Sequence, residues 1–285
     1  MAKAATIHGK TWQEGRMGGQ MPWVTGTTRI FGTIANPAVH VRAPMVFNPL
    51  FAERGLDHVM VPITAAPENL AAVIDGLRGI RNFGGMAVTI PHKMELAAMC
   101  DTLGPTAQLT GAVNAVRFDP DGTLHGDNFD GAGFVAGLRL NGHDPTGMKV
   151  LMVGAGGAAR AIALALCEAG IDELLISNRT PEKATAIAGE LAELGGHRQA
   201  RGVASHDGGG VDMIVNTTSL GLHEGDAVPL PLETVDSGVL VAEIIMIPER
   251  TAWLADAEGR GLKTHYGHHM LDCQVELIGV FIGAL

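Results

Sequence analysis

A glycine-rich segment in the middle of the chain has the residue types that bind the phosphates of a dinucleotide. An apolar run, Val150 to Val153, leads into a Gly-x-Gly pattern. Gly154 permits a tight turn from strand to helix, Gly156 lets the backbone approach a pyrophosphate, and Ala159 lets the helix pack on the strand. The helix expected over 158–169 then points its free N–H groups at the phosphates. The predicted loop consists of Gly154, Ala155, Gly156, Gly157 and Ala158.

The residues after the next expected strand, 174–177, indicate which dinucleotide binds. They lie about 20 residues beyond the loop, where a residue that recognises the ribose normally stands. No Asp or Glu is present there to hold a free 2′-hydroxyl, whereas the Arg179 guanidinium suits a 2′-phosphate. NADP is therefore the expected cofactor, with NAD possible; an ordinary turn with a solvated arginine is the alternative. The further residues expected to bind the cofactor are Asn178, Thr180 and Thr217.

Two polar residues upstream have the types that acid–base chemistry requires. Lys93 lies in the first turn of an expected helix directly after a strand, and Asp130 lies at a strand-to-helix junction before the dinucleotide-binding half. Oxidation of an alcohol by hydride transfer needs a group that accepts the hydroxyl proton. A lysine whose pKa is set by burial and by a carboxylate partner can accept it. The alternative is a salt bridge at a cleft edge with only a structural role.

Six motifs follow one another along the chain: VTIPHK, GAVN, GDNFDG, VGAGGAARA, NRT and GHHMLDCQ. Through them the chain resembles the shikimate dehydrogenases from Phe31 onward, with GDNFDG in place of the usual G-x-N-T-D-G. The resemblance implies that Lys93 and Asp130 act as a pair on the hydroxyl that is oxidised. It also implies that three residues hydrogen-bond polar groups of the substrate, although each can also be a turn or cap residue. These three are Thr89, Asn114 and Gln274.

The chain departs from this family at five polar positions. The usual H-S-x-S-P, whose serines hold the substrate carboxylate, reads His40-Val41-Arg42-Ala43-Pro44, and Ala87, Phe129 and Met246 replace three further polar residues. A buried carboxylate without those donors would be costly. Either Arg42 binds the carboxylate, as in a genuine shikimate or quinate dehydrogenase, or the substrate is another cyclic or small hydroxy or keto compound. We expect the second, with weak or absent turnover of shikimate; a non-catalytic NADP-binding module is the remaining alternative.

The composition of the chain limits its possible partners and location. The chain has 285 residues, 46% of them hydrophobic, 39 glycines and a formal charge of −10 without a basic run. A small-molecule substrate is therefore expected, with nucleic acid and membrane excluded as partners. Three scattered cysteines without paired spacing indicate a reduced, cytoplasmic protein. No apolar segment of about 20 residues could span a bilayer, and the expected state is a monomer or a homodimer.

Short apolar strands alternate with helical segments, which predicts an α/β fold of two domains with a ligand at the cleft between them. Strands are expected at 30–34, 58–63, 86–90, 150–153, 174–177, 212–216, 239–245 and 262–264, with extended pieces at 111–117 and 123–124. Helices are expected at 43–53, 67–79, 91–99, 131–140, 158–169, 251–258 and 268–285. With the resemblance, the chain divides into an N-terminal extension (1–27), a substrate-binding domain (28–133), a Rossmann-type NADP-binding domain (134–265) and a C-terminal helix (266–285) that returns to the first domain.

Three histidines near the C-terminus raise the question of a metal. His265 and His269 are spaced i, i+4, but Gly267 lies between them and no acidic or cysteine third ligand is evident. Histidines at a helix start more often cap the helix or line a pocket. No metal is therefore expected.

Overall fold

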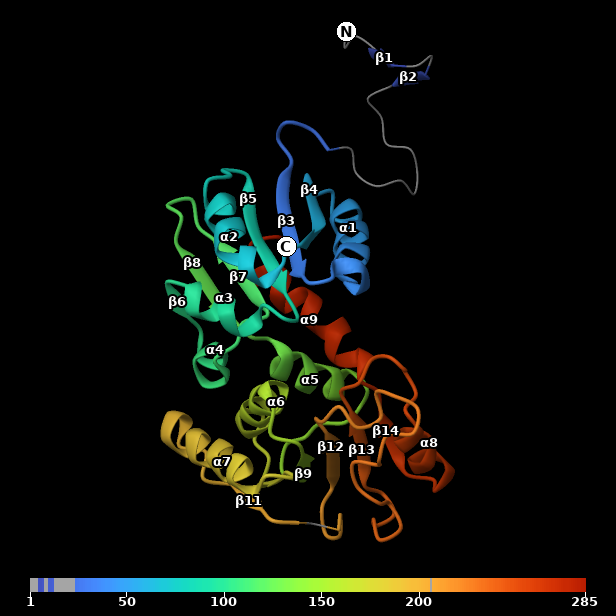
Figure 1. The fold of residues 1–285 in the computed structure, drawn as a ribbon. Helices are drawn as coiled ribbons and strands as arrows, with labels where there is room; N and C mark the ends of the chain where they lie inside the picture. The colour runs from blue at the N-terminus through green and yellow to red at the C-terminus, as the bar shows by residue number, and fades with distance from the viewer. Residues whose placement is uncertain (1–4, 8–9, 13–23, 206) are drawn as a thin grey trace.

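The structure, a computed structural model, describes residues 5–7, 10–12, 24–205 and 207–285. Two six-stranded sheets follow one another along the chain, and helices α5 (Asp130–Leu140) and α9 (His268–Phe281) lie where the two halves meet (Figure 1). Strands β1 (Ala5–Ile7) and β2 (Lys10–Trp12) form a separate antiparallel pair. Most of the expected extension over 1–27 lies outside the described residues.

The first sheet is mixed, with the strand order β4-β3-β5-β7-β8-β6. Strand β3 pairs in parallel with β4 and β5, while β7 is antiparallel to both β5 and β8. The strands are β3 (Arg29–Ala35), β4 (His58–Thr64), β5 (Phe83–Val88), β6 (Thr102–Leu103), β7 (Ala115–Phe118) and β8 (Leu124–Asp127). The short helices between them are η1 (Ala38–His40), α1 (Ala43–Glu53), η2 (Pro67–Asn69), α2 (Leu70–Arg78), α3 (Lys93–Met99) and α4 (Pro105–Thr110).

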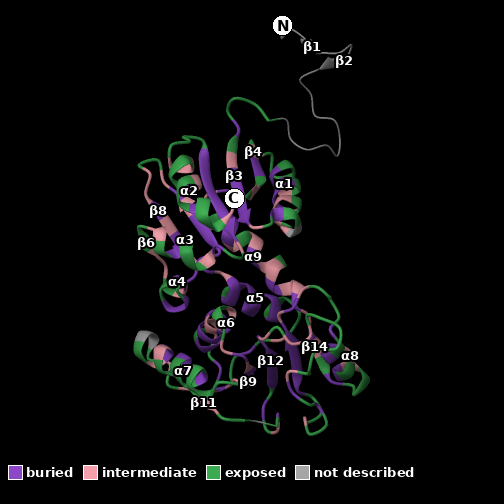
Figure 2. Cartoon of the chain, viewed as in Figure 1, coloured by how far each residue is buried: buried purple, intermediate pink, exposed green. Residues whose placement is uncertain are grey.

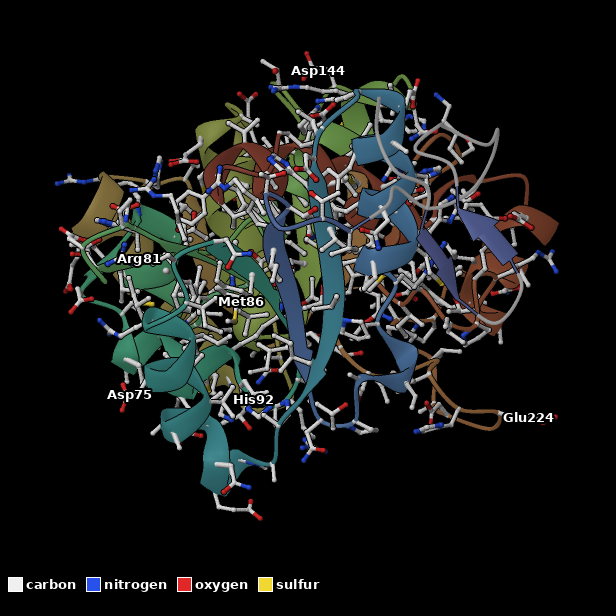
Figure 3. The ribbon with its side chains drawn as sticks, turned by 90° about the horizontal axis from the view of Figure 1, so that it is seen from above. Asp75, Arg81, Met86, His92, Asp144 and Glu224 are labelled. Carbon is white, nitrogen blue, oxygen red and sulfur yellow. The ribbon has the colours of Figure 1, made fainter. Side chains whose placement is uncertain are left out.

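Two apolar cores hold this first half together. One joins Leu70 and Ile74 of α2 and Leu96 of α3 to the sheet. The other joins α1 to the end of α9 through aromatic and aliphatic side chains that include Phe51 and Ile282. The central strands are the most deeply buried part of this half (Figure 2). His92, labelled in Figure 3, is fully buried, and its Nε2 lies 2.9 Å from the Ala65 carbonyl oxygen, which anchors the start of α3.

The second sheet is parallel throughout, with the order β11-β10-β9-β12-β13-β14. In chain order this is 3-2-1-4-5-6, the doubly wound arrangement that places a ligand beyond the carboxyl ends of its first and fourth strands. Its strands are β9 (Lys149–Val153), β10 (Glu173–Ser177), β11 (Ala200–Val203), β12 (Met213–Asn216), β13 (Leu240–Glu243) and β14 (Lys263–His265). Its helices are α6 (Gly157–Glu168), α7 (Pro181–Gly195) and α8 (Ala252–Gly259).

Helix α5 packs against α6 and α9 through glycines. A Cβ on Gly131 would lie 2.0 Å from the Ala161 carbonyl oxygen, and a Cβ on Gly133 would lie 2.4 Å from Gln274 Cγ. Only glycine therefore permits backbones this close. Helix α9 contributes to cores in both halves: its first turns place Met270 in the core of the second sheet, and its last turns reach the α1 core of the first. The prediction of a two-domain α/β fold with a returning C-terminal helix is confirmed.

Several expected bounds were wrong, and for β5 the reason is a contact with a distant part of the chain. Strand β5 begins at Phe83 rather than Met86, because Gly84 and Gly85 lie inside the sheet, where a Cβ on Gly85 would approach the Val116 carbonyl oxygen to 2.7 Å. Strand β5 also ends at Val88 rather than at residue 90, and α3 begins at Lys93 rather than at residue 91. Strand β7 begins at Ala115 rather than at residue 111, and β8 covers 124–127 rather than 123–124. Strand β13 covers 240–243 rather than 239–245, and α9 ends at Phe281 rather than at residue 285. Helices α4 and α7 and strand β11 were not expected. Within the described part of the chain, no helix is both long and apolar enough to cross a membrane.

The close contact between α5 and α6 predicts a specific sensitivity to one methyl group. Gly131→Ala should destabilise the protein by about 1–3 kcal/mol, because the added Cβ meets backbone that cannot rotate away. Gly189→Ala is the matched control, since Gly189 lies on an exposed face of α7 with no atom within 4 Å of an added Cβ; it should be neutral or stabilising by up to about 1 kcal/mol. Urea unfolding of both variants measures the difference, and equal effects would contradict the packing described.

Candidate active site

Three parts of the chain bring their side chains to the carboxylate of Asp130, which lies at the first turn of α5. Lys93, at the start of α3, donates from Nζ to Oδ2 at 2.7 Å. Asn114, just before β7, donates to Oδ1 at 2.9 Å, and Gln274 of α9 donates to the same oxygen at 3.3 Å. The Asn114 amide also donates to the Gln274 side-chain oxygen at 3.2 Å. The structure thus joins four of the six predicted catalytic and substrate-binding residues in one network.

The charge of Asp130 is maintained despite its burial. Burial alone would raise the pKa of this carboxyl, but the Lys93 ammonium and the hydrogen bonds from Lys93, Asn114 and Gln274 hold the pKa below its usual value. Asp130 is 7% exposed, while the Lys93 side chain is 28% exposed. The pair therefore consists of a buried, ionised carboxylate and a lysine whose side chain is still partly exposed.

Asn128 supports this network and was not predicted. Its side-chain oxygen accepts from the Asp130 backbone N–H at 2.9 Å, and its amide donates to the Ala112 carbonyl oxygen at 3.2 Å. Its position two residues before Asp130, inside GDNFDG, is the Asx pattern that fixes the backbone ahead of a helix. The spacing of Asn128 two residues before Asp130 was the sequence signal that could have identified it.

The other two predicted substrate-binding residues lie outside the network. Thr89 follows β5 and is half-buried; its backbone N–H donates to the Ile34 carbonyl oxygen at 3.1 Å. Arg42 precedes α1, is exposed, and makes no ion pair or side-chain hydrogen bond with the described residues. Among the positions that depart from the family, Ala43, Ala87 and Phe129 belong to the same apolar core, in which Phe129 packs against Phe281 with ring centroids 5.2 Å apart.

The glycine loop has the conformation that a dinucleotide requires. Gly154 has φ +120°, and a Cβ there would lie 2.4 Å from Thr217 Oγ1, so only glycine fits. An added Cβ on Gly156 or Gly157 would meet nothing within 4 Å, which leaves this face of the loop open. Helix α6 begins at Gly157 and has no side-chain cap, so its first N–H groups are available to an anion. The loop therefore fits a pyrophosphate.

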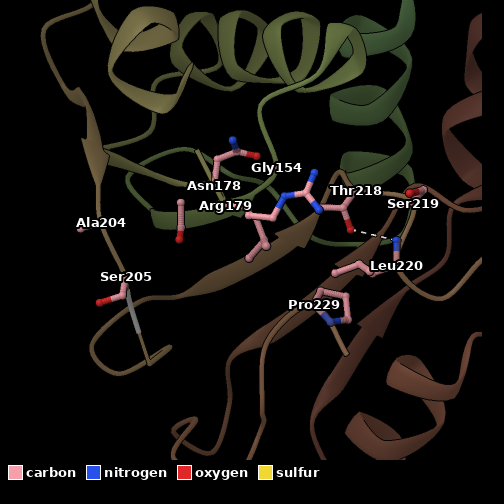
Figure 4. Close-up of a pocket in the computed structure, with 11 residues that line it drawn as sticks. Gly154, Asn178, Arg179, Ala204, Ser205, Thr218, Ser219, Leu220 and Pro229 are labelled. Carbon is pink, nitrogen blue, oxygen red and sulfur yellow. Dashed lines mark hydrogen bonds between the residues drawn. The ribbon is translucent and has the colours of Figure 1, made fainter. Parts of the chain in front are cut away.

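A cavity of about 440 Å³ adjoins this loop at the carboxyl ends of the strands. Arg179 and Asn178 line it from the end of β10, Thr218 lines it from the end of β12, and Arg179 extends across the opening (Figure 4). Arg179 is exposed, so its guanidinium is available to a 2′-phosphate. Thr180 is exposed at the start of α7, and its carbonyl oxygen accepts from Asn178 at 2.9 Å.

The structure differs from two expectations, one about Thr217 and one about the histidines near the C-terminus. Thr217 is buried, and its hydroxyl donates to the Val153 carbonyl oxygen at 2.9 Å; its neighbour Thr218 lines the cavity instead. The statement that no acidic third ligand accompanies the histidines was wrong, because helical spacing brings Asp272 to His268 and His269.

A second buried carboxylate, Glu243 at the end of β13, was also missed. It accepts from Asn216 with both oxygens, at 3.1 and 3.0 Å, and from the backbone N–H groups of Ile244 and Ile245 at 2.9 and 3.1 Å. Burial raises its pKa, although these hydrogen bonds oppose the shift. Glu243 fixes the chain as it leaves the sheet toward Met246. The only sequence signal that could have identified Glu243 was a single acidic residue at the end of an apolar strand.

The two sites have complementary chemistry. A bound nicotinamide supplies the hydride acceptor or donor, and the protein must supply a group for the hydroxyl proton. Lys93 can take that proton when its amine is neutral, and Asp130 then stabilises the ammonium that forms. Asn114 and Gln274 hold Asp130 so that it faces Lys93. A parallel dinucleotide-binding sheet and an opposing lysine–carboxylate pair define a two-domain, nicotinamide-dependent dehydrogenase.

Comparison with known proteins identifies the family. Residues 33–116 match the shikimate dehydrogenase substrate binding domain, and residues 139–199 match the shikimate / quinate 5-dehydrogenase family. The NADP-dependent shikimate dehydrogenase of Rubrobacter xylanophilus is 41% identical over 254 residues, 88% of this chain and 89% of the relative. The chain therefore belongs to the shikimate dehydrogenase family, oxidoreductases that act on a CH–OH group, and the resemblance drawn from its motifs is confirmed.

Solved structures agree with this assignment. A shikimate dehydrogenase in complex with NADP⁺ superposes with a TM-score of 0.85 at 33% identity, covering 94% of each chain. The 5-ketofructose reductase of Gluconobacter sp. strain CHM43 has a TM-score of 0.79 at 30% identity, covering 91% of this chain and 94% of its own. The predicted use of NADP is confirmed by the NADP-dependent relatives.

The position of Arg179 predicts how the cofactor preference can be changed. Arg179→Ser should weaken NADP binding about tenfold to a hundredfold, a loss of roughly 1.4–2.8 kcal/mol, and leave NAD binding nearly unchanged, because only NADP carries the 2′-phosphate. Titration of both cofactors against the free protein measures this. Arg198→Ser is the matched control, since Arg198 is an exposed arginine at the opposite end of the sheet, ahead of β11. Equal losses for NADP and NAD would contradict the assignment.

Proposed function

We propose that this protein catalyses reversible hydride transfer between NADP(H) and a small or cyclic hydroxy or keto compound that carries no carboxylate. Lys93 accepts or returns the hydroxyl proton, Asp130 positions Lys93 and stabilises the ammonium that forms, and Asn114, Gln274 and Thr89 hydrogen-bond the remaining hydroxyls. Uncharged donors and acceptors suit a polyol, because each unmatched hydroxyl would leave a buried partner unpaired. The dinucleotide lies against the loop over 154–158, with Arg179 at its 2′-phosphate.

The observation that carries this proposal is the apolar packing at positions where the family has polar residues. In the family, serines at the positions of Val41 and Ala43 hold the substrate carboxylate. Here Ala87 is buried in an apolar core that also contains Ile278 of α9, and Ala43 and Phe129 pack against that core. A carboxylate held by these side chains would lose its hydration without gaining hydrogen bonds, which is unfavourable by several kcal/mol.

Arg42 gives the second candidate function, the oxidation of shikimate or quinate. It is the charged residue of the altered His-Val-Arg-Ala-Pro segment, and no described partner holds its guanidinium away from a ligand. The relatives named shikimate dehydrogenase favour this candidate. A relative named 5-ketofructose reductase favours the first, because a ketofructose is a keto sugar without a carboxylate. The Lys93–Asp130 pair argues against a non-catalytic NADP-binding module, which would have no use for it.

Three broader expectations belong to this proposal. The enzyme acts in the cytoplasm, its only partner in catalysis is a small molecule, and it works as a monomer or a homodimer. The three unpaired cysteines support the first, since disulfides are rare in cytoplasmic proteins. Burial raises the pKa of the Cys100 thiol to about 11 and that of the Cys167 thiol to about 12. Thiols of such high pKa remain protonated and unreactive near neutral pH.

A substrate panel tests the proposal. NADPH formation or consumption is followed with cyclic polyols and keto sugars, and with shikimate and quinate and their keto forms. The best uncharged compound should show a kcat/KM at least about a hundredfold above that of shikimate. A kcat/KM for shikimate in the ordinary enzyme range, about 10⁴ M⁻¹s⁻¹ or more, with no better uncharged compound, would overturn it.

Arg42→Ala separates the two candidates. If Arg42 holds a carboxylate, its loss raises the KM for shikimate about tenfold or more, as expected for a charge-assisted hydrogen bond. If the substrate is uncharged, the variant keeps the wild-type kcat/KM for that compound.

A further inference from the structure

The start of α9 carries a cluster of metal-ligating side chains. His268 and His269 are the first two residues of the helix, and Asp272 lies one turn later. One ligand atom from each of the three lies within 4.8 Å of the others. The two imidazole rings have centroids 4.0 Å apart. Asp272 is spaced i+4 from His268 and i+3 from His269, so its side chain is a neighbour of both on the helix surface.

A buried imidazole beneath this cluster is the second, independent observation. His265, at the end of β14, is 1% exposed, and neither of its ring nitrogens has a hydrogen-bond partner among the described residues. Its ring packs against that of His269 with centroids 5.0 Å apart. Buried polar groups without partners are uncommon and costly. An imidazole that binds a metal through one nitrogen needs an acceptor for its other N–H, and His265 is the unpartnered base beside His269.

An acidic residue from the adjoining loop lies at the rim of the same cluster. Glu249, which follows the segment Met246 to Pro248, places Oε1 3.6 Å from Nδ1 of His268. That Nδ1 is buried and makes no hydrogen bond with the described residues. The cluster thus combines two imidazoles and one carboxylate from α9 with a second carboxylate from the loop after β13.

We propose that His268, His269 and Asp272 form a binding site for one divalent transition-metal ion, best suited to Zn²⁺, with Glu249 or water at the fourth position. Two imidazole nitrogens and one carboxylate oxygen match the ligands of zinc, whereas Ca²⁺ and Mg²⁺ prefer oxygen ligands throughout. The ion takes no part in hydride transfer. It links the first two turns of α9, and, where Glu249 is the fourth ligand, it also joins this helix, which carries Gln274, to the loop after β13.

Direct metal binding tests the proposal. Untagged protein stripped with EDTA is titrated with Zn²⁺ against a chromophoric chelator, and with Co²⁺ followed by its visible absorption. We expect one equivalent of zinc to bind, a Co²⁺ spectrum of a low-coordinate nitrogen and oxygen site, and a higher thermal unfolding temperature with zinc, because the ion binds the folded chain. His268→Asn and Asp272→Asn should each weaken zinc binding at least about tenfold.

His223→Asn is the matched control, since it removes an exposed histidine on the loop after β12, and it should bind zinc as the wild type does. Thermal unfolding and NADP titration without zinc show whether each variant is folded. Absence of zinc binding by the folded wild-type chain, or zinc affinity unchanged in both α9 variants, would overturn the proposal. These readouts need no substrate, so they remain decisive whatever the substrate panel shows.

Discussion

The buried charge of Asp130 is the constraint on which the rest of the site depends. A carboxylate with 7% exposure is stable only if it is paired and hydrogen-bonded. Lys93, Asn114 and Gln274 meet this requirement from three elements that are 16 to 144 residues distant in sequence. Gln274 has two structural roles, because it donates a hydrogen bond to the Asp130 carboxylate and also packs against Gly133 in the contact between α9 and α5.

The close packing of α5 makes this arrangement possible and links it to the cofactor. Gly131 allows α5 to pack closely against α6, the helix that begins at the glycine loop, and Gly133 allows it to pack against α9 beside Gln274. Asp130 at the start of α5 is thus held by backbone contacts to the second half and by side chains that include Lys93 and Asn114 of the first half. Ala43, Ala87 and Phe129 belong to a separate apolar core and make none of the hydrogen bonds that hold the Asp130 carboxylate.

Local signals were enough to predict the dinucleotide-binding half and to single out Lys93 and Asp130, which the structure places in contact. The glycine loop and Arg179 lie within one βαβ unit, so their spacing alone predicts a dinucleotide site, and Lys93 and Asp130 were identified from motifs. The remainder depends on distant contacts. Gly84 and Gly85 do not look like strand residues until Phe31 and Val116 are placed beside them, and Asp127 caps α4 from 20 residues away. Asp272 lies one helical turn after His268 in a helix that was expected to begin at residue 268, so its spacing from the histidines was an available signal that was not used.

The most direct test of the central claim compares chemistry with cofactor binding in Lys93→Ala. With the compound that the enzyme turns over best, kcat/KM should fall about 10²- to 10⁴-fold, the range expected for loss of a general acid–base group. NADP affinity should remain within about twofold, since Lys93 lies outside the dinucleotide-binding loop, and circular dichroism should show a folded chain. A variant that keeps kcat/KM within a few-fold of the wild type, or that loses NADP binding in parallel with turnover, would contradict the assignment of Lys93 and Asp130 as the catalytic pair.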